Sequence, residues 1–426
     1  MRIVIVGAGA AGLAMAIRLK RSGHEDFTIV ERSEGVGGTW HDNRYPGAGC
    51  DVPSHLYCFS FAPKSDWHYK FARQPEIESY FQQLVETERL GPHLQLNTEV
   101  QGAQFVDGGW RIRTSRGELA ADVLISGTGQ LNRPHIPALP GLESFAGQRF
   151  HSARWDPAFD PRGKRVVVIG NGASAAQIVP EIAPQVAQLT VLQRSPAYVF
   201  PRKDRAYRGF EKWLFRYVPG WRRFYRSLIY WQLESRFPAL HQHSLIGKLV
   251  TWMCLRNLRN AISDPALRAQ LTPDYPIGCK RIVISDDWYP ALARDNVTLE
   301  TSPIERITPE GVVTVDGTLH PADAIIFATG FDSTSFLAPM QITGRDGTAL
   351  ATTWRGGALA HRGVAVSGFP NLFLLYGPNT NLGHSSILFM IECQVRYILG
   401  CLDQLERRGA RWLDVKPEAM ARSNAE

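Results

Sequence analysis

The stretch RIVIVGAGAAG at residues 2–12 predicts a buried strand, a tight turn and the start of a helix. Gly7, Gly9 and Gly12 have the GxGxxG spacing of a dinucleotide-binding turn, in which glycine lets the backbone approach a pyrophosphate closely. The next apolar run, FTIVE, ends at Glu31, 24 residues after Gly7. An acidic side chain at this strand tip accepts a hydrogen bond from a free ribose 2′-hydroxyl.

The same pattern occurs a second time in KRVVVIGNGASAAQ at residues 164–177. Gly170 and Gly172 repeat the turn, Ser174 follows them, and an alanine replaces the third glycine. The following strand, LTVLQR, ends at Arg194, whose fork of donors suits a 2′-phosphate and not a bare hydroxyl. The sequence therefore predicts two different dinucleotides, FAD at the first turn and NADPH at the second.

Each turn is followed by a similar array of short alternating strands. Residues 93–129 and 295–330 both place such strands around glycine turns and close with an apolar strand that ends in TG. Each stretch predicts a three-stranded meander that returns to its parent sheet. We therefore predict an α/β fold with two Rossmann-like dinucleotide-binding domains, each a mostly parallel three-layer sheet with a β-meander.

The domain order follows from the positions of these motifs. We expect the following segments: an FAD-binding domain, first part, at 1–144; a linker at 145–163; an NADPH-binding domain at 164–320, with a helical insertion at about 196–256; and the second part of the FAD-binding domain at 321–426.

Composition indicates an ordinary globular chain. It has 426 residues, 44% of them hydrophobic and 20% charged, and no apolar run approaches the length of a bilayer span. The N-terminus enters the first strand at once, without a signal peptide, so we expect a cytoplasmic protein. The six cysteines form no CxxC pair, which disfavours a disulfide reductase and a zinc site, and we expect no metal.

A basic and aromatic segment occupies residues 202–226. It holds nine Lys or Arg residues against Asp204 and Glu211, interleaved with the aromatic residues Trp213, Phe215, Tyr217, Trp221, Phe224 and Tyr225. Such a segment can lie on an anionic membrane or bind nucleic acid. We favour a helical insertion whose aromatic face packs on the nucleotide domains while its charges face water. Pro219 and Gly220 predict a break between two helices, placed where the insertion can cover a substrate pocket.

The stretch FAGQRFHSARWD, residues 145–156, resembles the FxGxxxHxxxW(P/D) fingerprint of the type I Baeyer–Villiger monooxygenases. Related N- and S-oxygenating flavin monooxygenases usually have Tyr or Phe at the position of Trp155. The resemblance implies a conformational role for His151 and Trp155 in domain movement, and not proton transfer to substrate. Packing of the two rings in the linker is the structural alternative.

Three further stretches are similar to the same family: residues 35–61, 278–297 and 377–386. The SHLYCFSF run within the first points to the subgroup resembling 4-hydroxyacetophenone monooxygenases, while Gly49 stands where many members have Arg. The resemblance implies that flavin contacts come from Gly38, Thr39, Trp40, Asp51 and Asn379, and that Lys280 joins Arg194 on the 2′-phosphate.

The resemblance also implies an activity. We therefore expect an FAD- and NADPH-dependent monooxygenase that inserts one atom of O2 next to the carbonyl of a small-molecule ketone, through a C4a-peroxyflavin. Arg281 would stabilise the anions of this reaction, and Asp51 would hold its guanidinium in place. A surface salt bridge for Arg281 and a turn cap for Asp51 are the structural alternatives. Oxygenation of amine or sulfide centres, or mainly NADPH oxidase activity, are the alternative functions.

Overall fold

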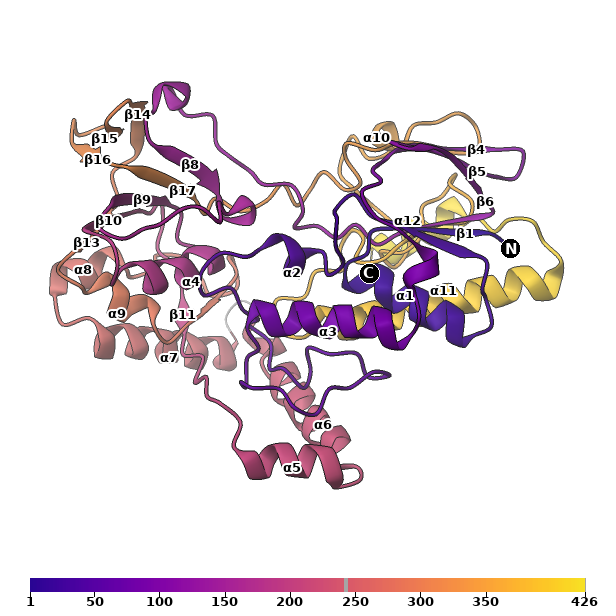
Figure 1. Cartoon of the computed structure of the whole chain (residues 1–426), viewed down its shortest axis with the longest axis horizontal. Helices are drawn as coiled ribbons and strands as arrows, with labels where there is room; N and C mark the ends of the chain where they lie inside the picture. The colour runs from indigo at the N-terminus through magenta and orange to yellow at the C-terminus, as the bar shows by residue number, and fades with distance from the viewer. Residues whose placement is uncertain (241–243, 426) are drawn as a thin grey trace.

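The computed structural model describes residues 1–240 and 244–425. Figure 1 shows two lobes, which we call the first unit, with the N-terminal strand, and the second unit. Each lobe is built around a five-stranded parallel sheet, as the two glycine turns predicted. The predicted fold class is confirmed.

The sheet of the first unit contains strands from both ends of the chain. Its order is β3 (Leu94–Gln95), β2 (Phe27–Val30), β1 (Ile3–Val6), β7 (Val123–Ser126) and β19 (Leu372–Leu374). All of these strands run parallel. Ile3 and Ile5 pack in one core with the helices, whereas Val4 and Val6 pack in another with the meander. Both faces are therefore covered, which is why the strand is apolar throughout.

The second unit repeats this arrangement. Its sheet order is β13 (Val297–Glu300), β10 (Gln188–Leu192), β9 (Arg165–Ile169), β17 (Ala324–Phe327) and β8 (Gln148–His151). The strand β17 pairs with β9, so the predicted boundary at residue 320 is wrong for this strand, which belongs to the second sheet. The predicted linker contributes β8 to the edge of the same sheet. The remaining domain boundaries stay predictions.

Both predicted meanders are present. The first consists of β4 (Val100–Val106), β5 (Gly109–Thr114) and β6 (Gly117–Ala121), and β18 (Gln341–Thr343) joins it parallel to β4. The second consists of β14 (Ile304–Thr308), β15 (Gly311–Thr314) and β16 (Leu319–Pro321). Each leads into a strand of its parent sheet, β7 or β17, as the repeat predicted.

Helices cover the sheets. In the first unit they are α1 (Ala10–Arg21), α2 (Thr39–Asp42), α3 (Gln74–Thr87), α10 (Leu350–Thr353), α11 (Ile387–Arg408) and α12 (Pro417–Ala425). In the second they are α4 (Ala173–Ile182), α8 (Pro265–Gln270) and α9 (Trp288–Leu292). Short 3-10 helices are Gly91–His93, Leu142–Ser144, Ser152–Arg154 and Phe237–Leu240. No helix in the described ranges is long and apolar enough to cross a membrane.

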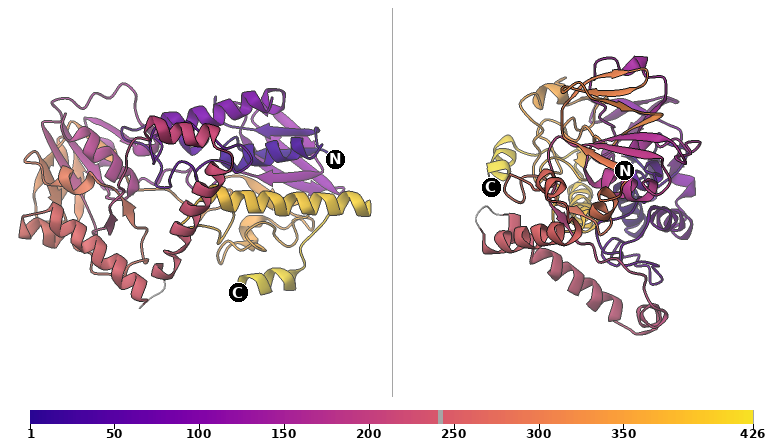
Figure 2. Two further views of the ribbon diagram at one scale, coloured as in Figure 1. Left: turned by 90° about the horizontal axis from the view of Figure 1, so that it is seen from below. Right: turned by 90° about the vertical axis from the view of Figure 1, so that its left-hand side faces the viewer.

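The helical insertion leaves the second unit after β11 (Val199–Phe200). It forms α5 (Gly209–Tyr217), α6 (Trp221–Glu234) and α7 (Leu245–Ala261) before the chain reaches β12 (Val283–Ile284). The predicted break is confirmed, because Gly220 separates α5 from α6 with φ of +78°. In the left view of Figure 2, α5 lies against the first unit, whereas α7 returns toward the second.

The expected packing of the insertion is correct only in part. Phe215 is buried in the core of the first unit, and Tyr225 packs against that core. In contrast, Trp213, Tyr217 and Phe224 are 56%, 59% and 58% exposed. One aromatic face therefore docks on the first unit, and a second aromatic face is open to solvent.

Arg226 and the ring contact between Phe215 and His55 both hold the insertion on the first unit. Nη1 of Arg226 in α6 donates to the backbone oxygens of His55, Leu56 and Cys58 at 3.0, 3.3 and 2.8 Å. The buried His55 ring lies 4.0 Å from the Phe215 ring, and its Nε2 atom has no hydrogen-bond partner among the described residues. Burial, together with the charges of Arg222 and Arg226, lowers the pKa of His55 to about 3.

Because the pKa of His55 is lower in the folded chain than its usual value of about 6.5, the unfolded chain takes up this proton first. Stability is therefore lost as pH falls from about 6.5 toward 3. Replacing His55 with Phe should remove about 2 kcal/mol of the loss in the free energy of unfolding between pH 7.5 and pH 5, because about 1.5 pH units of this range lie below the usual pKa of histidine. Thermal unfolding at the two pH values measures this difference.

The control for this prediction is His135→Phe, since His135 is exposed and its ring forms no hydrogen bond or ion pair within the described residues. The control variant should keep the pH dependence of the parent protein. Equal pH dependence of unfolding in the His55→Phe variant and the parent would show that His55 is not the group responsible.

Candidate active site

A cavity lies where the two units meet. It is lined by residues of the first glycine turn, by the segment of residues 37–52, and by Ser174, Gln177 and Arg281 of the second unit. The predicted site residues that line it are Gly7, Gly9, Glu31, Gly38, Thr39, Trp40, Asp51, Ser174 and Arg281. The structure therefore brings together most of the predicted flavin contacts and both predicted catalytic residues.

The first glycine turn has no room for side chains. Gly7 has φ of +102°, and a Cβ atom there would lie 2.8 Å from the Gly127 oxygen. A Cβ atom on Gly12 would lie 1.8 Å from the Gly7 oxygen, so the third glycine permits helix α1 to start against the turn. No side chain caps the N-terminus of α1 at Gly9. Its first N–H groups are therefore available to a phosphate.

Glu31 lies at the end of β2 beside this turn. Its Oε2 atom accepts a hydrogen bond from the Ala8 N–H at 2.7 Å, and its Oε1 atom accepts one from the Ser33 N–H at 2.8 Å. These bonds fix the carboxylate at the cavity wall, and each oxygen still has a lone pair for another donor. The position and chemistry fit the ribose of a dinucleotide bound at the first turn.

The second turn repeats the geometry with more open space. Gly170 has φ of +112°, and a Cβ atom there would lie 2.4 Å from the Ala328 oxygen. A Cβ atom on Gly172 would meet no atom within 4 Å, and no side chain caps α4. The Gly172 side of the turn is therefore open for a ligand.

Two cations lie at the end of the strand that follows. Arg194 comes two residues after β10 and is exposed, with no hydrogen bond or ion pair of its side chain among residues 1–240 and 244–425. The Nζ atom of Lys280 donates to Ser195 Oγ at 2.6 Å and lies 4.4 Å from the centroid of the Tyr275 ring. Lys280 is thus held next to the residue that follows Arg194, as expected for two cations on one phosphate.

The segment at residues 35–61 forms the opposite wall of the cavity. Gly38 has φ of +56°, and a Cβ atom there would lie 2.9 Å from the Gly9 Cα atom. This close contact places Thr39 and Trp40 at the wall. The Trp40 Nε1–H donates to the Tyr57 hydroxyl at 2.9 Å, which fixes the indole ring.

Asp51 and Arg281 form an ion pair between the units. The distance from Arg281 Nη2 to Asp51 Oδ2 is 3.5 Å, and the Asp51 side chain is 16% exposed, compared with 60% for Arg281. Burial raises the pKa of Asp51, while the charges of Arg281 and Arg202 oppose that rise. Asp51 therefore holds the Arg281 guanidinium through its Nη2 atom, and the rest of this group can make contacts in the cavity.

Gln177, on helix α4 just after the second turn, is a site residue that the motifs did not identify. Its Oε1 atom accepts hydrogen bonds from the Tyr45 hydroxyl at 3.0 Å and from the Gly49 N–H at 3.4 Å. Its Nε2 atom donates to the Gly49 oxygen at 3.0 Å. The only available signal was a lone amide in the apolar helix sequence ASAAQIVPEI.

Asn379, His151 and Trp155 are among the predicted residues that do not line the cavity. Asn379 is exposed, with φ of +60°, although its neighbours Tyr376 and Leu382 line the cavity. His151 is buried at the end of β8, where its Nδ1 atom accepts a hydrogen bond from the Ala153 N–H at 3.1 Å. The Trp155 ring packs edge-on against Phe150 in the second unit. Neither His151 nor Trp155 lines the cavity, although the His151 ring packs edge-on against Phe331, which does.

Comparison with known proteins gives a consistent result. A family model described as flavin-binding monooxygenase-like matches residues 1–341. A Baeyer–Villiger monooxygenase of Streptomyces coelicolor is 46% identical over 427 residues, covering 100% of this chain and 82% of the relative. The chain is also similar to a crystal structure of OTEMO in complex with FAD and NADP, with a TM-score of 0.91 and 28% identity over 100% of this chain and 89% of the other.

A second solved structure resembles the chain as closely. It is the ε-caprolactone-bound crystal structure of cyclohexanone monooxygenase, with a TM-score of 0.90 and 29% identity over 100% of this chain and 91% of the other. The chain belongs to the flavin-binding monooxygenase-like family and is a flavin-dependent monooxygenase. The predicted resemblance to the Baeyer–Villiger enzymes is confirmed, whereas the subgroup and the roles of single residues stay predictions.

Proposed function

We propose that this protein uses FAD and NADPH to insert one oxygen atom of O2 next to the carbonyl of a ketone, which gives an ester or a lactone. The observation that carries the proposal is the ion pair of Arg281 with Asp51 at the wall of a cavity between two dinucleotide turns. Relatives crystallised with FAD and NADP, and one with bound ε-caprolactone, support the cofactors and the product class.

The residues present fit both nucleotides. Gly7, Gly9 and Glu31 would hold the pyrophosphate and ribose of FAD, and Trp40 would lie near its ring system. Gly172 and Arg194, with Lys280 nearby, would hold NADPH. When bound, the flavin takes two electrons from NADPH and passes them to oxygen, which is chemistry that the side chains alone cannot perform.

Arg281 has the properties that an oxygen insertion requires. Its guanidinium does not titrate near neutral pH, so it supplies a constant positive charge where an attacking oxygen anion and the oxyanion of the carbonyl adduct develop. Asp51 fixes the guanidinium from the side of the first unit. A partner is needed because an arginine that moves freely gives up much of the benefit of a preorganised charge.

Replacement of Arg281 tests the proposal directly. Arg281→Ala should lower the rate of ester or lactone formation on the order of 10²–10³-fold, which is typical for loss of one donor at a developing charge. Asp51→Asn should act in the same direction. The measurement is product formation from a panel of ketones, with flavin reduction by NADPH followed separately under anaerobic conditions.

Arg162→Ala is the matched control, because Arg162 forms a surface ion pair with Asp160 at 2.7 Å. It should leave product formation unchanged. Normal ketone oxidation by the Arg281→Ala enzyme would exclude the assigned role, and oxygenation of thioethers without any ketone oxidation would replace the proposed reaction by heteroatom oxygenation.

The choice of nucleotide gives a second prediction. Arg194→Ala should weaken NADPH binding by about 1.5–3 kcal/mol, which is the usual contribution of a hydrogen bond to a charged group. Binding of NADH should change little, since NADH lacks the 2′-phosphate. Titration of the FAD-loaded protein with both nucleotides measures the difference, and equal losses for the two would remove Arg194 from this site.

The third prediction concerns His151 and Trp155, to which we assign conformational roles. His151 ends a strand of the second sheet, and Arg154, three residues later in the chain, has its Nη1 atom 3.9 Å from Asp42 Oδ2 of the first unit. His151→Ala should loosen this connection and admit water to the site during turnover. We expect more hydrogen peroxide and less ester per NADPH consumed, on protein corrected for FAD content. An unchanged ratio, with only a lower melting temperature, would indicate a packing role.

A further inference from the structure

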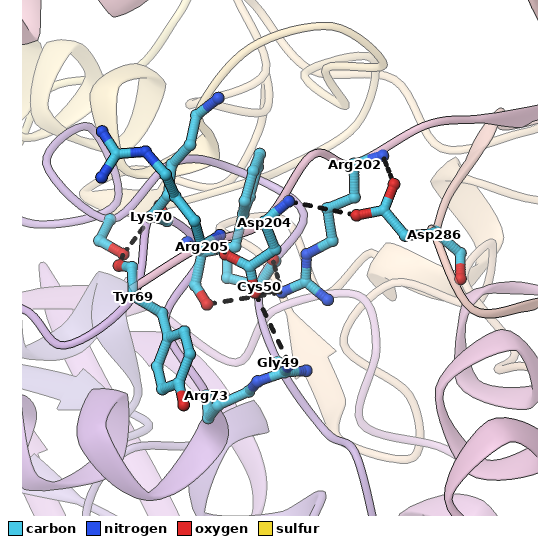
Figure 3. Close-up of polar contacts among 12 residues, drawn as sticks. Gly49, Cys50, Tyr69, Lys70, Arg73, Arg202, Asp204, Arg205 and Asp286 are labelled. Carbon is cyan, nitrogen blue, oxygen red and sulfur yellow. Dashed lines mark hydrogen bonds and ion pairs between the residues drawn. The ribbon is translucent and has the colours of Figure 1, made fainter. Parts of the chain in front are cut away.

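Arg202 is a buried cation that connects the two units close to Asp51. It follows β11 of the second unit and is 9% exposed. Its Nη2 atom donates to the Cys50 backbone oxygen at 3.1 Å and lies 3.5 Å from the Phe71 oxygen, both in the first unit. Its guanidinium also lies 5.1 Å from the centroid of the Phe71 ring. Figure 3 shows this side chain extended from Asp286 toward Cys50.

The backbone of Arg202 is fixed by the segment that carries Arg281. The strands β11 and β12 pair in parallel, and Arg281 comes two residues before β12. Asp286, two residues after β12, accepts the N–H groups of Arg202 and Lys203 at 2.8 and 3.0 Å (Figure 3). The two paired strands β11 and β12 therefore hold both Arg202 and Arg281 toward the first unit.

Arg202 does not line the cavity, whereas Gly49, Cys50 and Asp51 do. It therefore lies behind the Cys50–Asp51 backbone and touches neither substrate nor flavin. We propose that Arg202 is a positioning residue, which holds this backbone from the second unit and keeps the Asp51 carboxylate aligned with Arg281. The inference rests on the proposed role of Asp51 and Arg281 in oxygen insertion.

The charged groups around Asp51 determine how the pKa of its carboxyl group changes when Arg202 is removed. The groups that face Asp51 are Arg202, Arg281, Cys50 and Tyr45. Burial raises the pKa of the Cys50 thiol far above neutrality and that of Tyr45 to about 12, so neither side chain carries charge near neutral pH. Asp204, which lies 3.9 Å from Arg202, also pairs with Arg73 at 3.6 Å.

Asp51 is thus the carboxyl group at this site whose pKa responds to the charge of Arg202. Burial raises its pKa, and Arg281 and Arg202 lower it. Loss of Arg202 should therefore raise the pKa of Asp51 further, so that the carboxyl group stays protonated, and detached from Arg281, up to a higher pH.

The test compares FAD-loaded proteins. Arg202→Ala removes the donor, and Arg202→Met removes the charge while keeping most of the volume over the Phe71 ring. Arg223→Ala is the control, because Arg223 is an exposed arginine of the same insertion with no side-chain hydrogen bond or ion pair within the described chain. Adding Gly49→Arg to Arg202→Ala is the rescue, since a Cβ atom at Gly49 would lie 3.4 Å from Arg202 Nη2.

Hydrogen exchange gives a readout that needs no ketone. Backbone amides of residues 48–52 should exchange about tenfold faster in both Arg202 variants, as expected for loss of a hydrogen bond to a charged group. Exchange in the Arg223→Ala control should match the parent protein. Unchanged exchange in both Arg202 variants would overturn the inference.

Turnover gives the readout that separates positioning from simple packing. In the Arg202 variants the acid limb of the pH profile for ester formation should move to higher pH, and more NADPH should be consumed per ester formed. The KM for NADPH should stay within about twofold of the parent value, and Gly49→Arg should move the acid limb back. Faster exchange with an unchanged pH profile would reduce Arg202 to a packing residue and overturn the inference.

The two proposals fail in different ways. If the parent protein forms no ester or lactone from any ketone, the proposed function is wrong, and the exchange data still test whether Arg202 holds the Cys50–Asp51 backbone. If the parent forms ester and the Arg202 variants do so with the same pH profile and coupling, the proposed function stands and the inference about Arg202 is wrong.

Discussion

The site depends on a carboxylate of one unit that meets guanidinium groups of the other. The Asp51 side chain is mostly shielded from solvent, with 16% of it exposed, and Arg281 reaches it from the second unit at 3.5 Å. A buried carboxylate without such partners is costly, so the approach of the second unit stabilises the ionised form. Neither unit contains this arrangement alone, because the carboxylate and the cations lie on opposite sides of the boundary.

Backbone constraints were the part of the fold that the sequence predicted best. A glycine turn between an apolar strand and a helix has few alternative structures, and the crowded environment of Gly7 explains why no other residue serves there. The meanders were predictable because their period-two pattern and their turns agree. The position of β17 was not, since an apolar strand buried on both faces does not indicate which of two similar sheets it joins.

The site was predicted to the extent that the resemblance supplied the residues. The approach of Asp51 to Arg281 and of Lys280 to Ser195 agrees with it. Asn379 does not line the cavity, because a turn motif fixes the backbone and a left-handed residue in that turn can face solvent, and its flavin contact stays a prediction. Gln177 and Arg202 were missed as site residues because their partners are mainly backbone atoms of the other unit, and no local pattern reports such contacts.

Gln177 also joins helix α4 of the second unit to the segment of the first unit that carries Asp51. The first turn of α4 lies beside the open side of the second glycine turn, and the amide of Gln177 holds both the N–H and the oxygen of Gly49. Gly49 is two residues before Asp51, and packed backbones transmit displacement with little loss. A displacement of α4 would therefore pass to the segment of residues 49–51 through the Gln177 amide.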